Sequence, residues 1–199
     1  MTIQKGLVYV FTGNGKGKTS AALGVGVRAA LSGMTVVMVC WYKSRDWDVS
    51  EYRLADQFPN FKVFPMGVGF RITNYESGIM NQRGRQIKTA PIAGGGVVVD
   101  RAGENEHKKA AKAALRKAKE LVGQVDMLIL DEVNNAVSDG LIDLSALIDL
   151  ISDREKTHLV LTGRGAHPKI VELADLVTEM RKIKHPYDRG RKAVKGLDF

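Results

Sequence analysis

Apolar and polar positions along this chain form two kinds of pattern. Short runs rich in β-branched residues are typical of buried strands, and they occupy positions 6–11, 35–40, 61–66, 127–130, 158–162 and 176–180. Stretches with apolar residues at helical spacing occupy positions 19–31, 51–58, 104–122, 143–154 and 169–174. Gly33 ends the first predicted helix, Asp143 stands at the N-cap of the fourth, and Pro168 precedes the last.

Strands that alternate with helices indicate an α/β fold with a mostly parallel, doubly wound sheet. In such a sheet the loops that follow the strands lie along one edge, and ligands bind there. We therefore expect that edge to hold the loops after Phe11, Cys40, Met66, Leu130 and Thr162. No internal repeat or linker divides the chain, so residues 1–199 are predicted to form a single domain.

The segment 75–104 departs from this alternation. Two short apolar runs flank the three glycines at 94–96, a pattern typical of a β-hairpin or of a mobile flap. The glycines could also cradle a phosphate. Because nothing marks the next residues as a helix N-terminus, a structural turn is the favoured interpretation.

The strongest chemical signal is a loop rich in glycine and lysine between the first strand and the first helix. Its glycines allow backbone N–H groups to surround a polyphosphate, and the following helix N-terminus adds positive charge. Lys18 is expected to neutralise the terminal phosphates of ATP, and the Thr19 hydroxyl to reach Mg²⁺. Only three residues separate Gly13 from the Gly-Lys pair, one fewer than in the common motif. The predicted ATP-binding residues of the loop are Gly13, Asn14, Gly15, Lys16, Gly17, Lys18, Thr19 and Ser20.

A second motif is the pair Asp131 and Glu132, which ends the apolar run 127–130. Acidic residues at the end of a strand commonly accompany a phosphate loop. Mg²⁺ prefers oxygen ligands and keeps several waters, so one or two carboxylates suffice. We therefore predict that Thr19, Asp131 and Glu132 contact the metal, directly or through water, and that Lys18 and Glu132 are catalytic. The alternative for both acids is a turn or helix-cap role after a strand.

Composition limits the partners and the cellular location that we expect for this protein. The formal net charge is +8, but lysines of the stretch 104–122 lie above apolar residues at helical spacing, as in a helix with a solvated basic face. Nucleic acid is therefore not expected as a partner. The single cysteine, Cys40, cannot form an internal disulfide, and no apolar stretch is long enough to span a membrane. These features predict a cytoplasmic protein.

Beyond these motifs, the sequence resembles the P-loop type of corrinoid adenosyltransferases. The resemblance is carried by GNGKGKTSAALGVGVRAA from Gly13, LDEV from Leu130 and LTGRGAHPKIVELADLVTEMRKIKHPYDRGRKAVKGLDF from Leu161. It implies a RecA-like P-loop fold, Mg²⁺ and ATP, a homodimer, and a role in cobalamin biosynthesis or salvage. It also implies that the cobalt(I) of a reduced corrinoid attacks the 5′ carbon of ATP and releases triphosphate, with a cobalt-reducing flavoprotein as a partner. Arg28 and Arg164 match family arginines, which makes them candidates for the ATP site.

The corrinoid side of the resemblance depends on one segment. The family has Gly-Phe-Thr-Trp, whose aromatic side chains crowd the lower face of the corrin. This chain has Gly69-Phe70-Arg71-Ile72, so Phe70 is kept and Ile72 stands where the family has Trp. The expected corrinoid contacts are Phe70, Ile72 and Trp41, for which packing in the core or at its rim is the alternative.

Two other functions stay open on the sequence. A divergent relative that hydrolyses ATP, or that serves as a regulatory module, fits Ile72 and the long segment 75–104. A nucleic-acid-stimulated ATPase fits the positive charge and the fold class. The products formed from ATP separate adenosyl transfer from hydrolysis.

Overall fold

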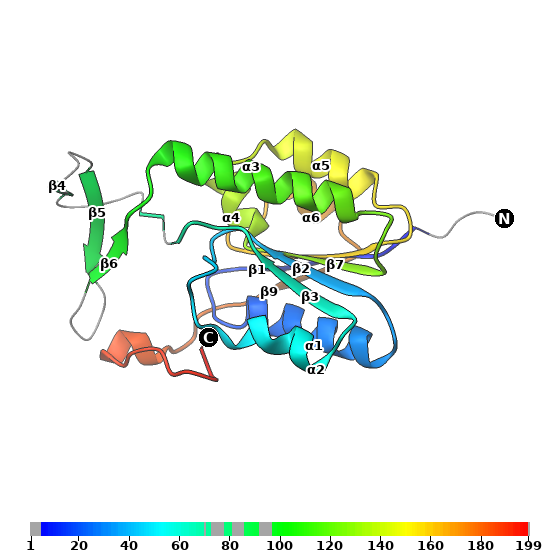
Figure 1. Ribbon diagram of the computed structural model, residues 1–199, viewed down its shortest axis with the longest axis horizontal. Coiled ribbons are helices and arrows are strands. Elements are labelled where there is room, and N and C mark those ends of the chain that lie inside the picture. The colour runs from blue at the N-terminus through cyan, green and yellow to red at the C-terminus, as the bar shows by residue number, and fades with distance from the viewer. Residues whose placement is uncertain (1–4, 70, 73–77, 81–85, 92–96, 199) are drawn as a thin grey trace.

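Six strands form a fully parallel sheet in the order β3-β2-β7-β8-β1-β9 (Figure 1). The structure is a computed structural model that describes all residues except 1–4, 70, 73–77, 81–85, 92–96 and 199. The strands of this sheet are β1 (Val8–Thr12), β2 (Val36–Cys40), β3 (Phe61–Pro65), β7 (Met127–Asp131), β8 (His158–Thr162) and β9 (Leu176–Glu179). The predicted mostly parallel α/β fold is therefore confirmed.

Helices cover both faces of this sheet, as the prediction of a doubly wound fold requires (Figure 1). One face carries α1 (Lys18–Leu31) and α2 (Leu54–Gln57). The other carries α3 (Glu104–Leu121), α4 (Val133–Ser138), α5 (Leu144–Ser152) and α6 (Pro168–Leu173). None of the described helices is both long and apolar enough to cross a bilayer.

The central strands are buried on both sides, which explains their unbroken apolar runs. Side chains of a strand alternate between the two faces of the sheet. In β2, Val37 and Val39 belong to the core layer that includes residues of α3 and α5, whereas Val36, Met38 and Cys40 belong to the layer that includes residues of α1. Complete burial of a side chain of this size stabilises the fold by about 1.5–3 kcal/mol.

Several local elements differ from the sequence-based expectation. The predicted helix 51–58 is a 3₁₀ turn, η1 (Ser50–Arg53), followed by the four-residue α2. Asp143 occupies the N-cap of α5, but its side chain makes no capping hydrogen bond. Helix α4 is too short for an apolar period to reveal it, and the basic tail contains a second 3₁₀ turn, η2 (Pro186–Arg189).

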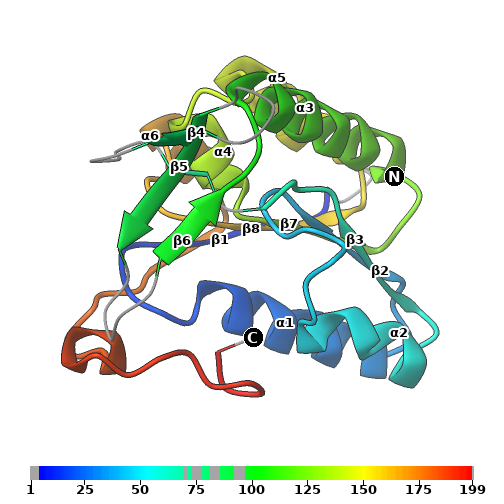
Figure 2. The same ribbon diagram turned by 60° about the vertical axis from the view of Figure 1, so that its left-hand side comes forward.

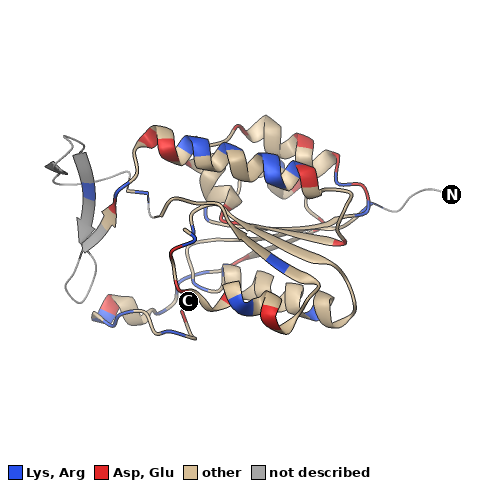
Figure 3. Cartoon of the chain, viewed as in Figure 1, with Lys and Arg blue, Asp and Glu red and all other residues tan. Residues whose placement is uncertain are grey.

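The surface of α3 carries six basic and three acidic residues and so contributes part of the positive charge. Its buried face consists mainly of small apolar residues, including Ala111, Ala114 and Ala118. Its acidic residues lie at the start of the helix and near its end, and the basic residues lie between them (Figure 3); Lys117 lies 3.3 Å from Glu120. The middle of the helix thus has a solvated basic face, as the sequence predicted.

Three short strands lie between β3 and α3, within the segment that broke the alternation. They are β4 (Gly78–Met80), β5 (Gln86–Pro91) and β6 (Val97–Asp100), and they pair antiparallel in that order. Figures 1 and 2 both show this small sheet outside the layers of the main sheet, near the start of α3. The glycines 94–96, for which a turn was predicted, lie outside the described residues.

We refer to the segment of β4, β5 and β6, which lies between β3 and α3, as the insertion. A buried acid closes its base. The backbone N–H of Ile72, which precedes the insertion, donates to Asp100 Oδ2 at 3.0 Å, and Asp100 ends the insertion. The other carboxylate oxygen of Asp100 lies 2.9 Å from His107 Nε2 on α3. Asp100 and His107 are almost completely buried, so each satisfies the other where water has little access.

An ion-pair network reinforces the same base. The Arg71 guanidinium lies 3.0 Å from Glu104 at the start of α3 and 3.2 Å from Asp139, which follows α4. Tyr42 donates its hydroxyl hydrogen to Asp139 at 2.7 Å. Arg71 therefore ties the chain before the insertion to the helix after it.

We predict that Ile72→Trp destabilises the protein. The Ile72 side chain is only 7% exposed, so a larger ring must displace its neighbours, at a cost of about 1–3 kcal/mol in the free energy of unfolding. Urea denaturation measures this change. Ile183→Trp is the matched control, because Ile183 is 97% exposed. Equal unfolding free energies for the two variants would contradict the burial of Ile72.

Candidate active site

The carboxyl edge of the sheet brings together the loops that follow β1, β2, β7 and β8, as expected for parallel strands. The segment after β9 joins them, because the Gly15 N–H donates to the Met180 carbonyl at 2.7 Å. Residues from distant parts of the sequence therefore surround the phosphate loop.

Two glycines fix the shape of this loop. Gly17 has φ +114° and forms the N-cap of α1, which places Lys18 and Thr19 in the first turn of the helix. Gly13 has φ +95°, and a Cβ there would lie 2.4 Å from the Met180 carbonyl oxygen. Only glycine combines this backbone angle with so close an approach of the segment that follows β9.

Lys18 lies along the inside of the loop. Its Nζ donates to the carbonyl oxygens of Gly13 at 2.9 Å and Gly15 at 2.8 Å, and the residue is 7% exposed. Burial lowers the pKa of Lys18, while the nearby carboxylate of Glu132 opposes that shift. The loop thus contains a buried cation bound chiefly to neutral carbonyls.

Asp131 lies behind Thr19 and is fully buried. Its Oδ1 accepts hydrogen bonds from the Thr19 hydroxyl at 2.9 Å and the Thr162 hydroxyl at 2.8 Å. Because the Thr19 hydrogen points to Asp131, the lone pairs of the Thr19 oxygen remain available to a cation. The geometry favours an indirect role for Asp131, through Thr19, over direct contact with a metal.

Glu132 has a strained backbone at the start of α4. Its φ of +62° is uncommon for a residue with a side chain, and its N–H donates to the Thr162 hydroxyl at 2.8 Å. Burial raises the pKa of Glu132, and the adjacent Asp131 raises it further, while the charges of Lys18, Lys43 and Arg164 act in the opposite direction. The charge of Glu132 is thus coupled to the cations of the phosphate-binding edge.

Lys43 and Glu51 were not identified from the sequence. Lys43 follows β2, and its Nζ lies 2.8 Å from Asp131 Oδ2 and 2.6 Å from Glu51 Oε1. Burial alone would lower the pKa of Lys43, but the carboxylates of Asp131 and Glu51 raise it well above its ordinary value. A lone lysine in a loop and an acid in a 3₁₀ turn have no sequence pattern that predicts this meeting.

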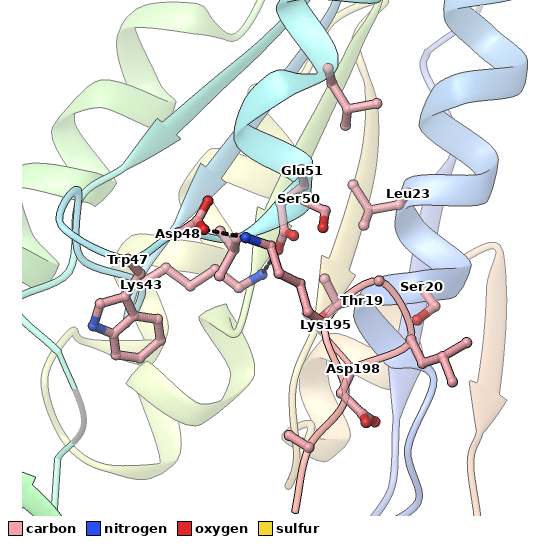
Figure 4. Close-up of a pocket in the computed structure, with 15 residues that line it drawn as sticks. Thr19, Ser20, Leu23, Lys43, Trp47, Asp48, Ser50, Glu51, Lys195 and Asp198 are labelled. Atoms are coloured by element: carbon pink, nitrogen blue, oxygen red, sulfur yellow. Dashed lines mark hydrogen bonds and ion pairs between the residues drawn. The ribbon is translucent and has the colours of Figure 1, made fainter.

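A cavity of about 940 Å³ lies beside these residues (Figure 4). Its walls come from α1, from the segment between β2 and α2, and from the C-terminal tail. The tail is held there by ion pairs between Lys195 and Asp48 and between Asp198 and Lys16 of the phosphate loop. The lining residues are Thr19, Ser20, Leu23, Lys43, Trp47, Asp48, Val49, Ser50, Glu51, Leu54, Ala193, Lys195, Gly196, Leu197 and Asp198.

The remaining residues predicted for the ATP site fall into two groups. Asn14, Lys16 and Ser20 are exposed on the phosphate loop or in the first turn of α1. Arg164 is exposed after β8, where its N–H donates to Asn135 Oδ1 at 2.7 Å. These residues share the carboxyl edge.

Arg28 is the exception, because the structure does not bring it to this edge. It lies in the last turn of α1, about 15 Å from Lys18 at 1.5 Å per helical residue. There it lines a separate cavity of about 300 Å³ with Leu7 and His158, at the amino ends of β1 and β8. A helix that starts at one edge of the sheet necessarily carries its last turn to the other.

The candidate corrinoid contacts offer little accessible surface. Trp41 is 3% exposed and packs in the core layer of α3 and α5, which is the alternative considered for it from the sequence. Ile72 is buried at the base of the insertion. Phe70 lies outside the described residues.

The described residues contain no group of three or more His, Cys, Asp or Glu side chains arranged to hold a metal. A site with few protein ligands still suits Mg²⁺, which is commonly held by one or two protein oxygens together with substrate phosphates. The oxygen donors Thr19 and Glu132 match that requirement, and Asp131 orients the first of them.

Comparison with known proteins identifies the family of this chain. The family model for the ATP:corrinoid adenosyltransferases BtuR/CobO/CobP matches residues 4–199. The corrinoid adenosyltransferase of Escherichia coli K12 is 32% identical over 201 residues, which cover 98% of this chain and 87% of that protein. The corrinoid adenosyltransferase of Pseudomonas aeruginosa is 34% identical over 200 residues, which cover 98% of this chain and 85% of that protein. The corrinoid adenosyltransferase CobA of Salmonella typhimurium is 32% identical over 201 residues, with 98% and 87% covered. The chain therefore belongs to the family of ATP:corrinoid adenosyltransferases.

Proposed function

We propose that this protein transfers the adenosyl group of ATP to the cobalt(I) of a reduced corrinoid and releases triphosphate. The observation that carries the proposal is the cluster of Lys18, Thr19, Asp131 and Glu132 beside a cavity of about 940 Å³, in a chain of this family. The cluster offers cations and oxygen donors to a polyphosphate, and the cavity offers space for the groups attached to it.

The reaction requires no nucleophile from the protein. Cobalt(I) supplies the electron pair of the new bond to the 5′ carbon of ATP. The bond from that carbon to oxygen breaks, and its electron pair leaves with the triphosphate. The protein needs to align the reactants and to stabilise the charge of the leaving group.

Lys18 and the start of α1 are suited to that stabilisation. Lys18 can exchange its contacts with two neutral carbonyls for contacts with phosphate oxygens. The N-terminus of the 14-residue α1 adds N–H groups and the positive end of its dipole. We propose that Asn14, Lys16 and Ser20 of the loop, together with Arg164, complete the phosphate-binding surface.

For the metal, we propose that Thr19 and Glu132 hold Mg²⁺ and that Asp131 orients the Thr19 hydroxyl. Mg²⁺, when bound, would neutralise part of the charge of the phosphates. The Thr19 oxygen has its hydrogen directed toward Asp131 at 2.9 Å, which leaves its lone pairs for a cation. Thr162 donates to the same carboxylate oxygen and thereby keeps Asp131 in this orientation.

We also propose a cellular location, an oligomeric state and a partner protein. A cytoplasmic location is supported by the single, buried Cys40, which cannot form a disulfide within the chain. A homodimer and a cobalt-reducing flavoprotein partner rest on the resemblance of the sequence to its family. Trp41 and Ile72, as they are packed here, offer no apolar surface to a corrin.

Lys18→Ala is predicted to weaken binding of Mg-ATP while leaving the fold intact. Loss of a charge-assisted contact worth about 1.5–3 kcal/mol corresponds to a change of about 10- to 100-fold in Kd. Isothermal titration calorimetry measures the affinity. Lys62→Ala is the control, because Lys62 is exposed on β3. An unchanged affinity in Lys18→Ala would remove this loop from the ATP site.

The products formed from ATP test the proposed reaction. We expect a Co(I) corrinoid and Mg-ATP to yield an adenosylated corrinoid and triphosphate in equal amounts. Phosphorus NMR distinguishes triphosphate from ADP and phosphate. Formation of ADP and phosphate, with no cobalt–carbon bond, would identify the protein as an ATP hydrolase instead.

A further inference from the structure

Lys43 occupies a junction between two parts of the proposed ATP site. It follows β2, its side chain is 17% exposed, and it borders the 940 Å³ cavity together with Thr19 (Figure 4). On one side it contacts Asp131 at the end of β7. On the other side it contacts Glu51 in η1, and Figure 4 shows its amine directed toward Glu51.

The charges explain why a cation is required at this position. The Asp131 side chain is completely buried and the Glu51 side chain is 7% exposed, so neither carboxylate has much contact with water. A buried carboxylate without a partner is costly, and two in one neighbourhood also repel each other. One ammonium group has three donors and can serve both acids, as the distances of 2.8 and 2.6 Å show.

The first arm of the junction leads to the proposed metal site. Lys43 binds Asp131 Oδ2, while Thr19 and Thr162 bind Oδ1. Both oxygens of the carboxylate are thereby fixed, and the plane of the carboxylate is set. Without Lys43 only Oδ1 keeps its hydrogen bonds, so the plane of the carboxylate and the orientation of the Thr19 hydroxyl are less firmly fixed.

The second arm leads to the wall of the cavity. Glu51 belongs to η1, and its neighbours Val49, Ser50 and Leu54 line the cavity. This segment has few regular hydrogen bonds of its own, because η1 and α2 are each only four residues long. The bond between Lys43 and Glu51 therefore anchors a short wall segment to the end of the central sheet.

We propose that Lys43 is a positioning residue for adenosyl transfer, which holds Asp131 for the metal site and holds the wall segment 49–54 against the nucleotide. The inference rests on the proposed function of this site. It assigns Lys43 two separable effects, one on the Mg²⁺ dependence of binding and one on recognition of the nucleoside part of ATP.

Three ligands separate these effects in calorimetric titrations of the full-length protein. Binding of Mg-ATP depends on both contacts of Lys43. Of these two contacts, binding of ATP with EDTA depends only on the one to Glu51, which holds the cavity wall, and binding of Mg-tripolyphosphate only on the one to Asp131, which holds the metal site. We expect Lys43→Met to weaken Mg-ATP about 10-fold or more, as for loss of roughly 1.4 kcal/mol. It should also reduce the gain in affinity that Mg²⁺ gives to ATP. Lys62→Met is the control, since Lys62 is exposed on β3.

Two further variants test the contacts of Lys43 with Glu51 and Asp131. Neither variant removes the positive charge at position 43 or leaves that charge without a carboxylate partner. Glu51→Gln should weaken Mg-ATP about 3- to 10-fold, which corresponds to roughly 0.7–1.4 kcal/mol, while changing Mg-tripolyphosphate by less than about 2-fold. Lys43→Arg should retain most of the Mg²⁺-dependent gain, because a guanidinium also has enough donors for two carboxylates. A purely structural role for Lys43 predicts equal losses for all three ligands.

The outcomes are distinguishable from failure of the proposed function. If the wild-type protein does not bind Mg-ATP, the proposed function fails. If the wild type binds and Lys43→Met keeps both its affinity and its Mg²⁺ gain, the inference about Lys43 is wrong. Should Lys43→Met not fold, equal effects of Glu51→Gln on Mg-ATP and Mg-tripolyphosphate would overturn the inference.

Discussion

A carboxylate with no exposed surface must have both oxygens satisfied by the protein, and Asp131 meets this constraint at the centre of the sheet edge. Thr19 and Thr162 donate to one oxygen, and Lys43 donates to the other. Strands β1, β2, β7 and β8 each lead to one of these residues. The requirements of a single buried charge thus fix the phosphate loop, the Lys43 segment and the end of β8 in relation to one another.

Sequence reasoning could locate the features of the candidate site that are local in the chain. The loop around Lys18 can be recognised by its glycine spacing between a strand and a helix. The pair Asp131 and Glu132 can be recognised by its position after an apolar run. It failed where contacts join distant segments. Nothing near Lys43 or Glu51 in the sequence shows that they meet, and the tail residue Asp198 reaches Lys16 only because the folded chain returns to the loop. Arg28 was proposed from the family match alone, without regard to the predicted helix 19–31, which carries it away from the phosphate loop.

Arg71 and Ile72 are both linked to the end of the segment that follows them. Arg71 pairs with Glu104, and the N–H of Ile72 binds Asp100, so the two residues close the base of the β4–β6 insertion. An insertion needs its two ends fixed near each other if it is not to disturb the core. No sequence pattern connects Arg71 and Ile72 with the end of the insertion. The structure shows the connection, because Asp100 accepts the Ile72 N–H and is also held by His107 of α3.

The cations at the carboxyl edge are not equivalent toward an incoming polyphosphate. Lys43 balances two buried carboxylates, and its raised pKa reflects the strength of those contacts. If phosphate drew Lys43 away, Asp131 and Glu51 would be left without compensation. Lys18 instead donates to neutral carbonyls, and burial lowers its pKa, so exchanging those carbonyls for phosphate oxygens improves its electrostatic environment. The same edge therefore contains one lysine suited to bind the substrate and another suited to hold the protein around it.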